Sequence, residues 1–362
     1  MRVLTVIAEM GSGGAEAVVH DLTSRLAADG VAVAVASNGG WRADRLAAAG
    51  IATPAVPLAD AGLPAMLRSA GVLRRVQRSW RPDLVHTHNV RATAAVHAAS
   101  LGRPGRHRPP LVTTVHGLAD DHYGPAVRVL ARASDVVVAV SDDVRERLVR
   151  AGLPAERVVV VENAVPDPRP EAPATRAGLA VPDGVPLVLC VARLAPPKRL
   201  DLLLDAWAAV PDAHLLVAGD GPDRAALERR GVSRVTFLGD RDDVGRLLAV
   251  ADLLVLPSDR EGLPMAVLEA MAAGVPVVAS AVGGLRELDP SAVHLVAPGR
   301  AAALAGAVAG LLADPPRRAG LAARGQELVA RRFSSAGMVG GYRNAYALAI
   351  GEGEPVVTKA RP

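Results

Sequence analysis

The sequence predicts an α/β protein built from two doubly wound parallel sheets. Short runs of Val, Ile and Leu alternate with longer segments of helical period along nearly all of the 362 residues. The runs are continuously apolar, which indicates strands buried on both faces, and the helices between them imply parallel strands joined by crossovers. A chain of this length is also too long for one typical core and suits two domains of about 150 to 200 residues.

Six expected strands fall in each half of the chain. Those of the first half cover residues 3–8, 31–36, 84–88, 111–115, 136–140 and 158–161. Those of the second half cover residues 187–191, 215–218, 235–238, 253–256, 275–279 and 293–296. We therefore expect one sheet in each half, with ligands bound beyond the carboxyl ends of its strands.

A proline-rich stretch marks the expected domain boundary. Residues 166–186 hold six prolines, a density that no helix or central strand tolerates. We expect a first domain over 1–165, a linker over 166–186 and a second domain over 187–334. In the remaining segment, 335–362, a helical pattern over Ser335–Ile350 could pack back on the first domain, which the sequence leaves open. Its candidate packing residues are Met338, Tyr342, Tyr346 and Leu348.

Composition narrows the cellular context and the partners. The single cysteine, Cys190, excludes an internal disulfide and favours a reducing cytosol. No run of 18 to 20 apolar residues is present, and residues 1–9 fit a first strand better than a signal peptide. The net charge of +4 suits a phosphate-bearing ligand or an anionic membrane surface. We expect a cytoplasmic protein, with peripheral contact at the inner face of the membrane left open, and no nucleic-acid partner.

The most informative stretch is 256–287, LPSDREGLPMAVLEAMAAGVPVVASAVGGLRE. Pro264 is predicted as the first residue of a helix that Gly274 ends. Glu261 and Gly262 then lie in the loop at the helix N-terminus, whose unpaired amides suit a phosphate. Glu269 lies one to two turns inside the helix, where it could accept hydrogen bonds from two vicinal hydroxyls. Gly283 and Gly284 open a further tight turn after a strand.

Either glutamate alone is explained as well by a helix-dipole partner or a solvated helix residue. Both together, eight residues apart, resemble the Glu-x7-Glu signature of retaining GT-B glycosyltransferases of the large family-four group. In that family the first Glu touches the transferred sugar and the second holds the ribose of the nucleotide, roles that fall on Glu261 and Glu269. Gly262 and Leu263 are assigned to the donor site with them.

The resemblance implies two Rossmann-like domains facing a cleft, with the nucleotide-sugar donor in the second. It implies a glycan, lipid-linked or small-molecule acceptor in the first domain, and no cofactor or metal. The expected reaction is a front-face displacement in which the leaving phosphate accepts the proton of the acceptor. A nucleotide-sugar epimerase or hydrolase of the same fold, or a non-catalytic nucleotide-sugar binding protein, are the alternatives.

Two cations follow the first expected strand of the second domain, in VARLAPPKRL. Arg193 and Lys198 can neutralise a diphosphate, the first through a fork of N–H groups and the second as a point charge. The alternative is two surface cations in an arginine-rich chain. In the family these residues grip the donor diphosphate. The match departs from the family pattern at Arg199, where a glycine is usual.

A glycine-rich segment, GSGGAE, follows the first expected strand over residues 11–16. It is not a dinucleotide fingerprint, because the third glycine of that pattern would fall on Glu16. A later turn, AGDGP, fails in the same way at Arg224, so an NAD-dependent enzyme is disfavoured. By resemblance Gly13 and Gly14 lie near the donor diphosphate, and Glu16 is assigned to the acceptor side.

Histidines follow two expected strands of the first domain. His86 and His88 share one face of a strand end, and His116 ends the next strand. A metal site is conceivable, but no Asp, Glu or Cys at convincing spacing completes it. Hydrogen-bonded buried histidines explain His86 and His88 better, with His88 assigned to the acceptor. By resemblance His116 donates a hydrogen bond near the transferred sugar.

Lesser matches complete the prediction. Asn163, residues 219–222 and residues 237–239 occupy positions where the family places loops facing the donor, with Gly219 and the backbone of Leu238 as binding candidates. In the first domain, residues 63–78 form an expected amphipathic basic helix. Its predicted apolar face is Leu63, Met66, Leu67, Ala70 and Leu73. Such a helix could lie on an anionic membrane, although packing on its own sheet is the simpler interpretation.

Overall fold

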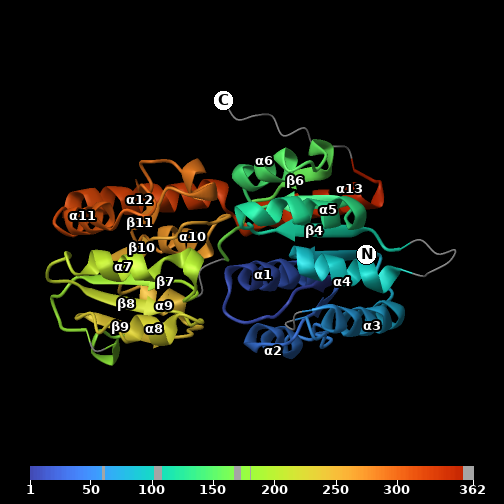
Figure 1. Ribbon diagram of the computed structural model, residues 1–362, viewed down its shortest axis with the longest axis horizontal. Coiled ribbons are helices and arrows are strands. Elements are labelled where there is room, and N and C mark those ends of the chain that lie inside the picture. The colour runs from blue at the N-terminus through green and yellow to red at the C-terminus, as the bar shows by residue number, and fades with distance from the viewer. Residues whose placement is uncertain (59–61, 102–107, 167–172, 180, 354–362) are drawn as a thin grey trace. The chain divides into compact units, whose positions relative to one another are not determined.

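A computed structural model describes residues 1–58, 62–101, 108–166, 173–179 and 181–353, without the side chain of Leu63. The chain divides into two units, Met1–Asn163 with Ser335–Pro362, and Ala164–Ser334 (Figure 1). Each unit contains one six-stranded sheet, and every strand pair in both sheets is parallel. This confirms the predicted fold class of two doubly wound sheets.

The sheet of the first unit has the order β2-β1-β3-β4-β5-β6. Its strands are β1 (Arg2–Val6), β2 (Ala32–Ala36), β3 (Leu84–His88), β4 (Leu111–Val115), β5 (Val136–Ala139) and β6 (Val158–Val160). Its helices are α1 (Gly14–Ala28), α2 (Trp41–Ala48), α3 (Leu63–Trp80), α4 (Val90–Ser100), α5 (Tyr123–Ala133), α6 (Asp142–Arg150) and α13 (Ser335–Ile350), with short 3-10 turns η1 (Asp120–His122) and η2 (Ala155–Arg157). The strand order reverses direction between β1 and β3, which makes their carboxyl ends the switch point of this sheet.

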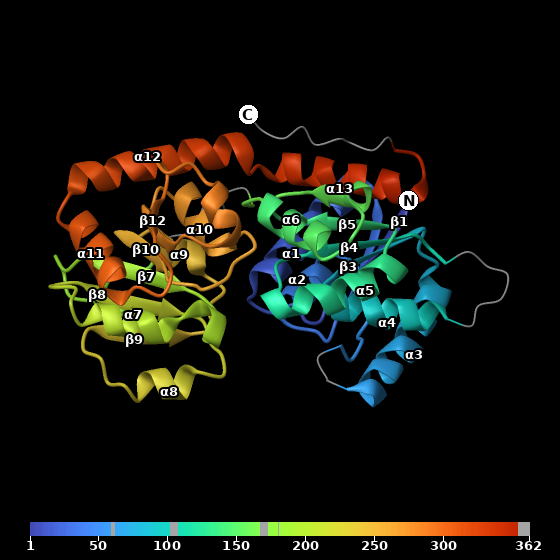
Figure 2. The ribbon, with the colours of Figure 1, turned by 45° about the horizontal axis from the view of Figure 1, so that its top comes forward.

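The last helix, α13, packs on the first unit although it follows the second unit in sequence (Figure 2). Met338, Tyr342 and Tyr346 are buried, and Leu348 is half-buried. At the start of the helix, Ser335 Oγ donates to Asp21 Oδ2 of α1 at 2.8 Å. Both the apolar face and this polar contact therefore hold α13 on the first unit.

The sheet of the second unit has the order β12-β11-β10-β7-β8-β9. Its strands are β7 (Leu187–Val191), β8 (His214–Ala218), β9 (Val235–Gly239), β10 (Leu253–Leu256), β11 (Val277–Ser280) and β12 (His294–Val296). Its helices are α7 (Leu200–Trp207), α8 (Arg224–Glu228), α9 (Val244–Leu248), α10 (Met265–Ala272), α11 (Ala301–Leu312) and α12 (Pro315–Arg332), with 3-10 turns η3 (Ala177–Leu179), η4 (Pro196–Lys198) and η5 (Gly283–Glu287). Here the order reverses between β7 and β10, so the switch point lies at their carboxyl ends.

The proline-rich stretch differs from the expectation of a linker without helix. A 3-10 turn, η3, forms between Pro173 and Pro182, where a single short turn needs few backbone donors. Leu179 and Val181 are buried, and the Arg176 side chain donates to Asp252 Oδ2 at 3.0 Å. The described residues from 173 to 186 belong to the second unit, whose boundary with the first falls after Asn163.

The buried face of helix α3 matches the predicted one only in part, with Met66 half-buried. Ala70 and Leu73 are buried as expected, whereas Leu67 is 59% exposed. The buried face includes the polar residues Ser69 and Gln77, and Ser69 Oγ donates to the carbonyl of Pro57 at 2.6 Å. A pattern based on apolar residues alone could not detect this difference.

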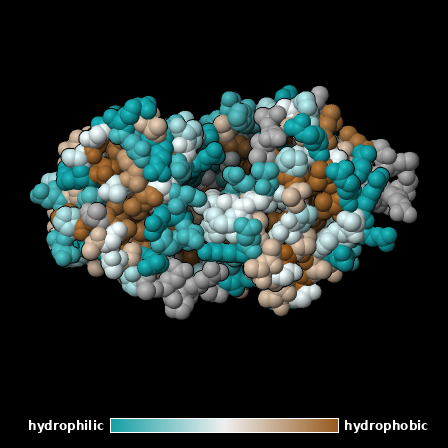
Figure 3. Space-filling model, turned by 90° about the horizontal axis from the view of Figure 1, so that it is seen from below, coloured by the Kyte–Doolittle hydropathy of each residue, from teal (hydrophilic) through white to brown (hydrophobic). Residues whose placement is uncertain are grey.

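On the face of the molecule seen in Figure 3, apolar residues form separate patches between hydrophilic ones. Over the described residues, no helix combines the length and the apolar character that crossing a membrane requires.

Candidate functional site

The loops that follow β7 and β10 meet at the switch point of the second sheet. The β7 loop carries η4 and Lys198, and the β10 loop carries Glu261. The amide N–H of Asp259 donates to the carbonyl oxygen of Pro197 at 2.9 Å, which joins the two loops through their backbones. Residues about 60 positions apart in sequence are therefore neighbours, as the strand order requires.

Lys198 and Glu261 form an ion pair in this place. Lys198 Nζ donates to Glu261 Oε1 at 2.6 Å, and Ser258 Oγ donates to the same oxygen at 2.6 Å. The Glu261 side chain is 7% exposed and the Lys198 side chain 26%. A carboxylate so far removed from water needs such partners, because burial of an unpaired charge is costly. Lys198 is also one of only two lysines in an arginine-rich chain.

Ser258 is a site residue that the sequence analysis did not single out. Its side chain is fully buried at the end of β10, three residues before Glu261. The available signal was a small hydroxyl residue at the carboxyl end of a buried strand. The contact that makes it a site residue is the hydrogen bond to Glu261, and the sequence alone does not give the position of the Glu261 side chain.

Arg193 lies on the same loop as Lys198 but is exposed. Within the part of the chain that the structure describes, its guanidinium group makes no hydrogen bond or ion pair. The structure thus pairs Lys198 with Glu261 and leaves Arg193 accessible at the edge of the sheet.

The turn of Gly283 and Gly284 packs directly on the Glu261 loop. The amide N–H of Gly284 donates to the carbonyl of Gly262 at 2.8 Å. Gly283 has φ +49°, and a Cβ atom there would lie less than 3.0 Å from the carbonyl oxygen of Glu261. Both the backbone conformation and the close approach require glycine.

Helix α10 begins one residue later than predicted. Pro264 is its N-cap in an extended conformation, and Met265 is the first helical residue. No side chain of the described residues caps this end, so the first N–H groups of α10 are not satisfied by a capping side chain. Leu263 and Gly262 are buried beside it, and Glu269 is half-buried in the second turn. This end of the helix has the properties of an anion-binding position.

The loops after β8 and β9 adjoin the β7 loop. Gly219 has φ +137°, and a Cβ atom there would lie less than 3.0 Å from the carbonyl oxygen of Ala192. In the ladder between β8 and β9, Val217 pairs with Phe237 and Ala218 with Gly239, so the register passes over Leu238. This bulge takes the Leu238 backbone out of the regular ladder at the carboxyl edge, where bulges often accompany binding sites.

At the switch point of the first sheet, α1 begins at Gly14 with Gly13 as its N-cap. A Cβ atom on Gly13 would lie less than 3.0 Å from the Glu16 carboxylate. Glu16 therefore lies over the positive end of α1, where its negative charge is stabilised.

Helix α2 supports this glycine-rich loop, which the sequence analysis missed. Trp41 Nε1 donates to Ser12 Oγ at 3.1 Å, and the Arg42 guanidinium donates to the carbonyl of Gly11. The guanidinium groups of Arg42 and Arg45 lie 4.1 and 4.4 Å from the Trp41 ring centroid. Trp41 thus links α2 to the loop that follows β1.

His86 and His88 are buried on β3, and half-buried His116 directly follows β4. His88 Nδ1 lies 3.1 Å from His116 Nε2. His86 bonds the Tyr346 hydroxyl of α13 at 2.9 Å and the Thr114 hydroxyl at 2.8 Å. The ring centroids of His86 and His88 lie 4.1 Å apart, so the two hydrogen-bonded groups are in contact, and the bond to Tyr346 connects the sheet to α13.

Burial keeps these histidines neutral. It lowers the pKa of His86 from 6.5 to about 3, with the His116 charge as the second cause, and lowers the pKa of His116 to about 4. Burial, with His86 and His116, also lowers the pKa of His88 well below its ordinary value. At neutral pH these groups therefore carry no positive charge, and of the three only His116 is partly exposed. Among the described residues, no three His, Cys, Asp or Glu side chains form a metal-binding group.

Two Rossmann-like units, each with candidate functional residues at the switch point of its sheet, are the architecture of GT-B glycosyltransferases. Residues 12–169 match the family model described as Glycosyltransferase Family 4, and residues 185–314 match the model described as Glycosyl transferases group 1. The chain belongs to this glycosyltransferase family.

Relatives and solved structures agree with this assignment. The chain is 30% identical over 347 residues to a GDP-mannose-dependent alpha-(1-6)-phosphatidylinositol dimannoside mannosyltransferase of Mycobacterium tuberculosis, covering 88% of this chain and 89% of the relative. It is 33% identical over 307 residues to 2-deoxystreptamine N-acetyl-D-glucosaminyltransferase of Streptomyces fradiae, covering 73% and 70%. The Anabaena protein HepE, in complex with UDP and glucose, has the same fold, with a TM-score of 0.81 and 24% identity over 95% of this chain and 98% of that one.

Proposed function

We propose that this glycosyltransferase takes its sugar from a nucleoside diphosphate sugar and transfers it with retention of configuration and without a metal. The observation that carries the proposal is the Lys198–Glu261 ion pair at the switch point of the second sheet. Beside it lie the uncapped N-terminus of α10 and the accessible Arg193. Cations and helix amides at one sheet edge suit a diphosphate.

In the proposed reaction, the bond between the anomeric carbon and the leaving phosphate oxygen breaks. Lys198, Arg193 and the α10 amides near Gly262 stabilise the charge that develops on the diphosphate. The new bond forms to the acceptor oxygen on the same face, and the acceptor proton passes to the leaving phosphate. Glu261 is held through Oε1 by Lys198 and Ser258, which favours a role in binding the sugar over attack on it. Glu269 accepts hydrogen bonds from the ribose hydroxyls.

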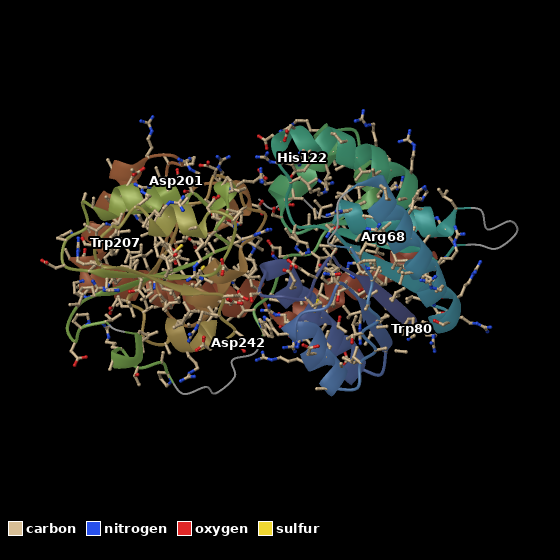
Figure 4. The ribbon with its side chains drawn as sticks, turned by 60° about the horizontal axis from the view of Figure 1, so that its bottom comes forward. Arg68, Trp80, His122, Asp201, Trp207 and Asp242 are labelled. Atoms are coloured by element: carbon tan, nitrogen blue, oxygen red, sulfur yellow. The ribbon has the colours of Figure 1, made fainter. Side chains whose placement is uncertain are left out.

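The proposal of a metal-independent reaction is supported by the same cations, which could supply the positive charge that a metal would otherwise provide. One pair of carboxylates makes a test of metal binding necessary. Asp240 and Asp242, the latter labelled in Figure 4, follow β9 and are separated by one residue. Two carboxylates one residue apart can bind Mg²⁺ together with a diphosphate. Diphosphate binding that is equal with magnesium and with EDTA would support the metal-free reaction.

We place the acceptor at the switch point of the first sheet. His88 and His116 offer neutral hydrogen-bonding groups there, and Gly13, Gly14 and Glu16 form the adjoining loop. The named relatives act on a phosphatidylinositol dimannoside and on 2-deoxystreptamine. A glycan, lipid-linked or small polyhydroxylated acceptor is therefore proposed.

We propose a cytoplasmic enzyme that touches the membrane through α3. This helix contains four arginines and no acidic residue. Arg68 (labelled in Figure 4), Arg75 and Arg78 are exposed together with Leu67. This combination of charge and apolar surface attracts an anionic lipid surface. Sedimentation with vesicles containing phosphatidylglycerol, but not with phosphatidylcholine vesicles, is the expected result. Equal sedimentation with both would contradict it.

A thermal-shift panel tests the donor site. UDP, GDP, ADP, dTDP and NAD are each added with magnesium and with EDTA, because a ligand that binds the folded state raises the melting temperature. We expect one nucleoside diphosphate to stabilise the wild type in both conditions and to have no effect on Lys198→Ala. Arg324→Ala, on the exposed side of α12, is the matched control and should respond like the wild type. A response to NAD alone would overturn the proposal.

A further inference from the structure

Arg199 has a backbone conformation that favours glycine. It precedes α7 as its N-cap, with φ +50° and ψ +45°, in the left-handed region. Residues other than Gly, Asn and Asp seldom adopt this conformation, because Cβ approaches the carbonyl oxygen too closely. The sequence departs from the family pattern at this position, and the backbone nevertheless makes the turn that a glycine would make. A long charged side chain here requires an explanation beyond the turn.

The guanidinium group of Arg199 binds two carboxylates. Arg199 Nε donates to Asp201 Oδ1 at 3.0 Å. Asp201, labelled in Figure 4, lies in the first turn of α7. Its second terminal nitrogen also donates to Asp201, at 3.1 Å. The first terminal nitrogen donates to both carboxylate oxygens of Asp259, at 2.9 and 3.2 Å. One contact is local, whereas the other joins residues 60 positions apart in sequence.

The Arg199–Asp259 ion pair joins the same two loops as the Lys198–Glu261 ion pair. Arg199 immediately follows Lys198, and Asp259 precedes Glu261 by two residues. The backbone bond from Asp259 to Pro197 joins the same two loops. Three contacts therefore join the loops that carry Lys198 and Glu261: the Lys198–Glu261 pair, the backbone bond from Asp259 to Pro197 and the Arg199–Asp259 pair. The Arg199–Asp259 pair is the ion pair of this set that does not involve a residue of the proposed diphosphate site.

We propose that Arg199 is a positioning residue, which through Asp259 holds Lys198 in the place where it meets the donor diphosphate. This inference rests on the proposed function. Without the Arg199–Asp259 pair, the β7 loop would adopt additional conformations in the free protein. Binding of the diphosphate would then have to order the loop, and this ordering would lower the affinity.

The solvent exposure of Arg199 and Asp259 allows a positioning role to be distinguished from a contribution to global stability. The Arg199 side chain is 29% exposed and that of Asp259 44%. Ion pairs with this access to water contribute little to global stability, although the two-oxygen contact of Asp259 gives the pair a defined geometry. Loss of the pair should therefore change ligand binding and leave the melting temperature of the free protein nearly unchanged.

Calorimetric binding of the nucleoside diphosphate that the thermal-shift panel identifies tests the proposal. Arg199→Gly removes the side chain and keeps the turn, since glycine adopts the left-handed conformation without strain. Asp259→Asn removes the long-range partner, and Asp201→Asn is the matched control because it removes only the local one. Both Arg199→Gly and Asp259→Asn should weaken binding about tenfold, and the double variant no further, since both remove one interaction. Asp201→Asn should bind within about twofold of the wild type.

The outcomes distinguish this inference from the proposed function. If the wild type binds no nucleoside diphosphate, the proposed function fails and this inference fails with it. If the wild type binds and Asp259→Asn binds equally well, only the positioning role is excluded. Equal losses in Asp259→Asn and Asp201→Asn would also exclude it, because the long-range pair would have no separate effect. Recovery of affinity in Asp259→Glu, which keeps the carboxylate, is the remaining expected result.

Discussion

Gly283 leaves no room for a side chain, because a Cβ atom there would lie less than 3.0 Å from the carbonyl oxygen of Glu261. Gly283→Ala should displace the Glu261 loop and abolish stabilisation by the nucleoside diphosphate. It should also lower the free energy of unfolding by about 2 kcal/mol or more, since strained φ and steric overlap add. Urea unfolding and thermal shift measure the two effects.

Gly299→Ala provides the control for backbone strain alone. Gly299 has a similarly positive φ of +71°, but nothing lies within 4 Å of a Cβ atom there. It should lose some stability and retain ligand binding. A Gly283→Ala protein that still binds the diphosphate as the wild type does would contradict the proposed packing of the two turns.

Ser258 holds the carboxylate that the site depends on. Ser258→Ala removes the hydroxyl that donates to Glu261 Oε1 at 2.6 Å. Within the described chain, Lys198 then remains as the only hydrogen-bond partner of that oxygen. A hydrogen bond to a charged group contributes about 1.5–3 kcal/mol, so sugar transfer should fall at least about tenfold. Ser258→Thr keeps the hydroxyl and should retain most activity. Equal rates in Ser258→Ala and the wild type would exclude the role.

The fold could be predicted from the sequence because strands buried on both faces give continuous apolar runs. All twelve expected strands are present, with ends that differ by at most two residues. The orientation of α3 could not be predicted in this way. Its buried face includes Ser69, whose hydroxyl is satisfied by the carbonyl of Pro57, a contact that composition does not reveal.

The proximity of candidate site residues could be predicted where it results from the order of the strands. It could not be predicted where it depends on tertiary contacts between side chains. Lys198 and Glu261 each follow a strand next to the switch point, so their proximity followed from topology. Ser258 bonds Glu261 within the β10 loop, and Asp259 bonds Arg199 of the β7 loop, and both contacts depend on the folded geometry of these loops. Trp41 contacts the glycine-rich loop from α2, a neighbour that no spacing in the sequence indicates.

Trp41 should control the mobility of the glycine-rich loop. Trp41→Ala removes the bond to Ser12 and the ring over which Arg42 lies, so amides 11–14 should exchange with solvent faster. Hydrogen-exchange mass spectrometry measures this change. Trp80→Ala removes another half-buried tryptophan of the same unit, labelled in Figure 4, and should leave these amides unaffected. Unchanged exchange in Trp41→Ala would contradict the prediction.

Tyr346 should anchor α13 to the first sheet through His86. Tyr346→Phe removes the hydroxyl 2.9 Å from His86 Nδ1 and leaves a buried nitrogen without its partner. The expected loss is about 1–3 kcal/mol in the free energy of unfolding of the first unit. Tyr342→Phe removes a longer bond, 3.3 Å from Thr114, and should cost less. A larger loss in Tyr342→Phe would reverse the order of importance proposed for the two tyrosines.

The first unit should lose stability as the pH falls below 6.5, because the buried histidines stay neutral in the folded state. Their pKa values are lowered by burial, to about 3 for His86 and about 4 for His116, from 6.5. Between these values the unfolded chain binds more protons than the folded one, so the free energy of unfolding rises with pH and levels off above 6.5. At pH 5.5 each such histidine should cost about 1.4 kcal/mol.

The pH effect is measured by urea unfolding at pH 7.5 and pH 5.5 in a Trp207→Phe background, where the remaining tryptophans, Trp41 and Trp80, both report on the first unit. With the lowered pKa of His88 included, the three histidines should together reduce the free energy of unfolding by about 4 kcal/mol at the lower pH. His88→Asn removes one titrating group and should reduce the pH dependence. His122→Gln, at an exposed position, should not. An equal free energy of unfolding at the two pH values would contradict the lowered pKa values, because the folded and unfolded chains would then bind the same number of protons.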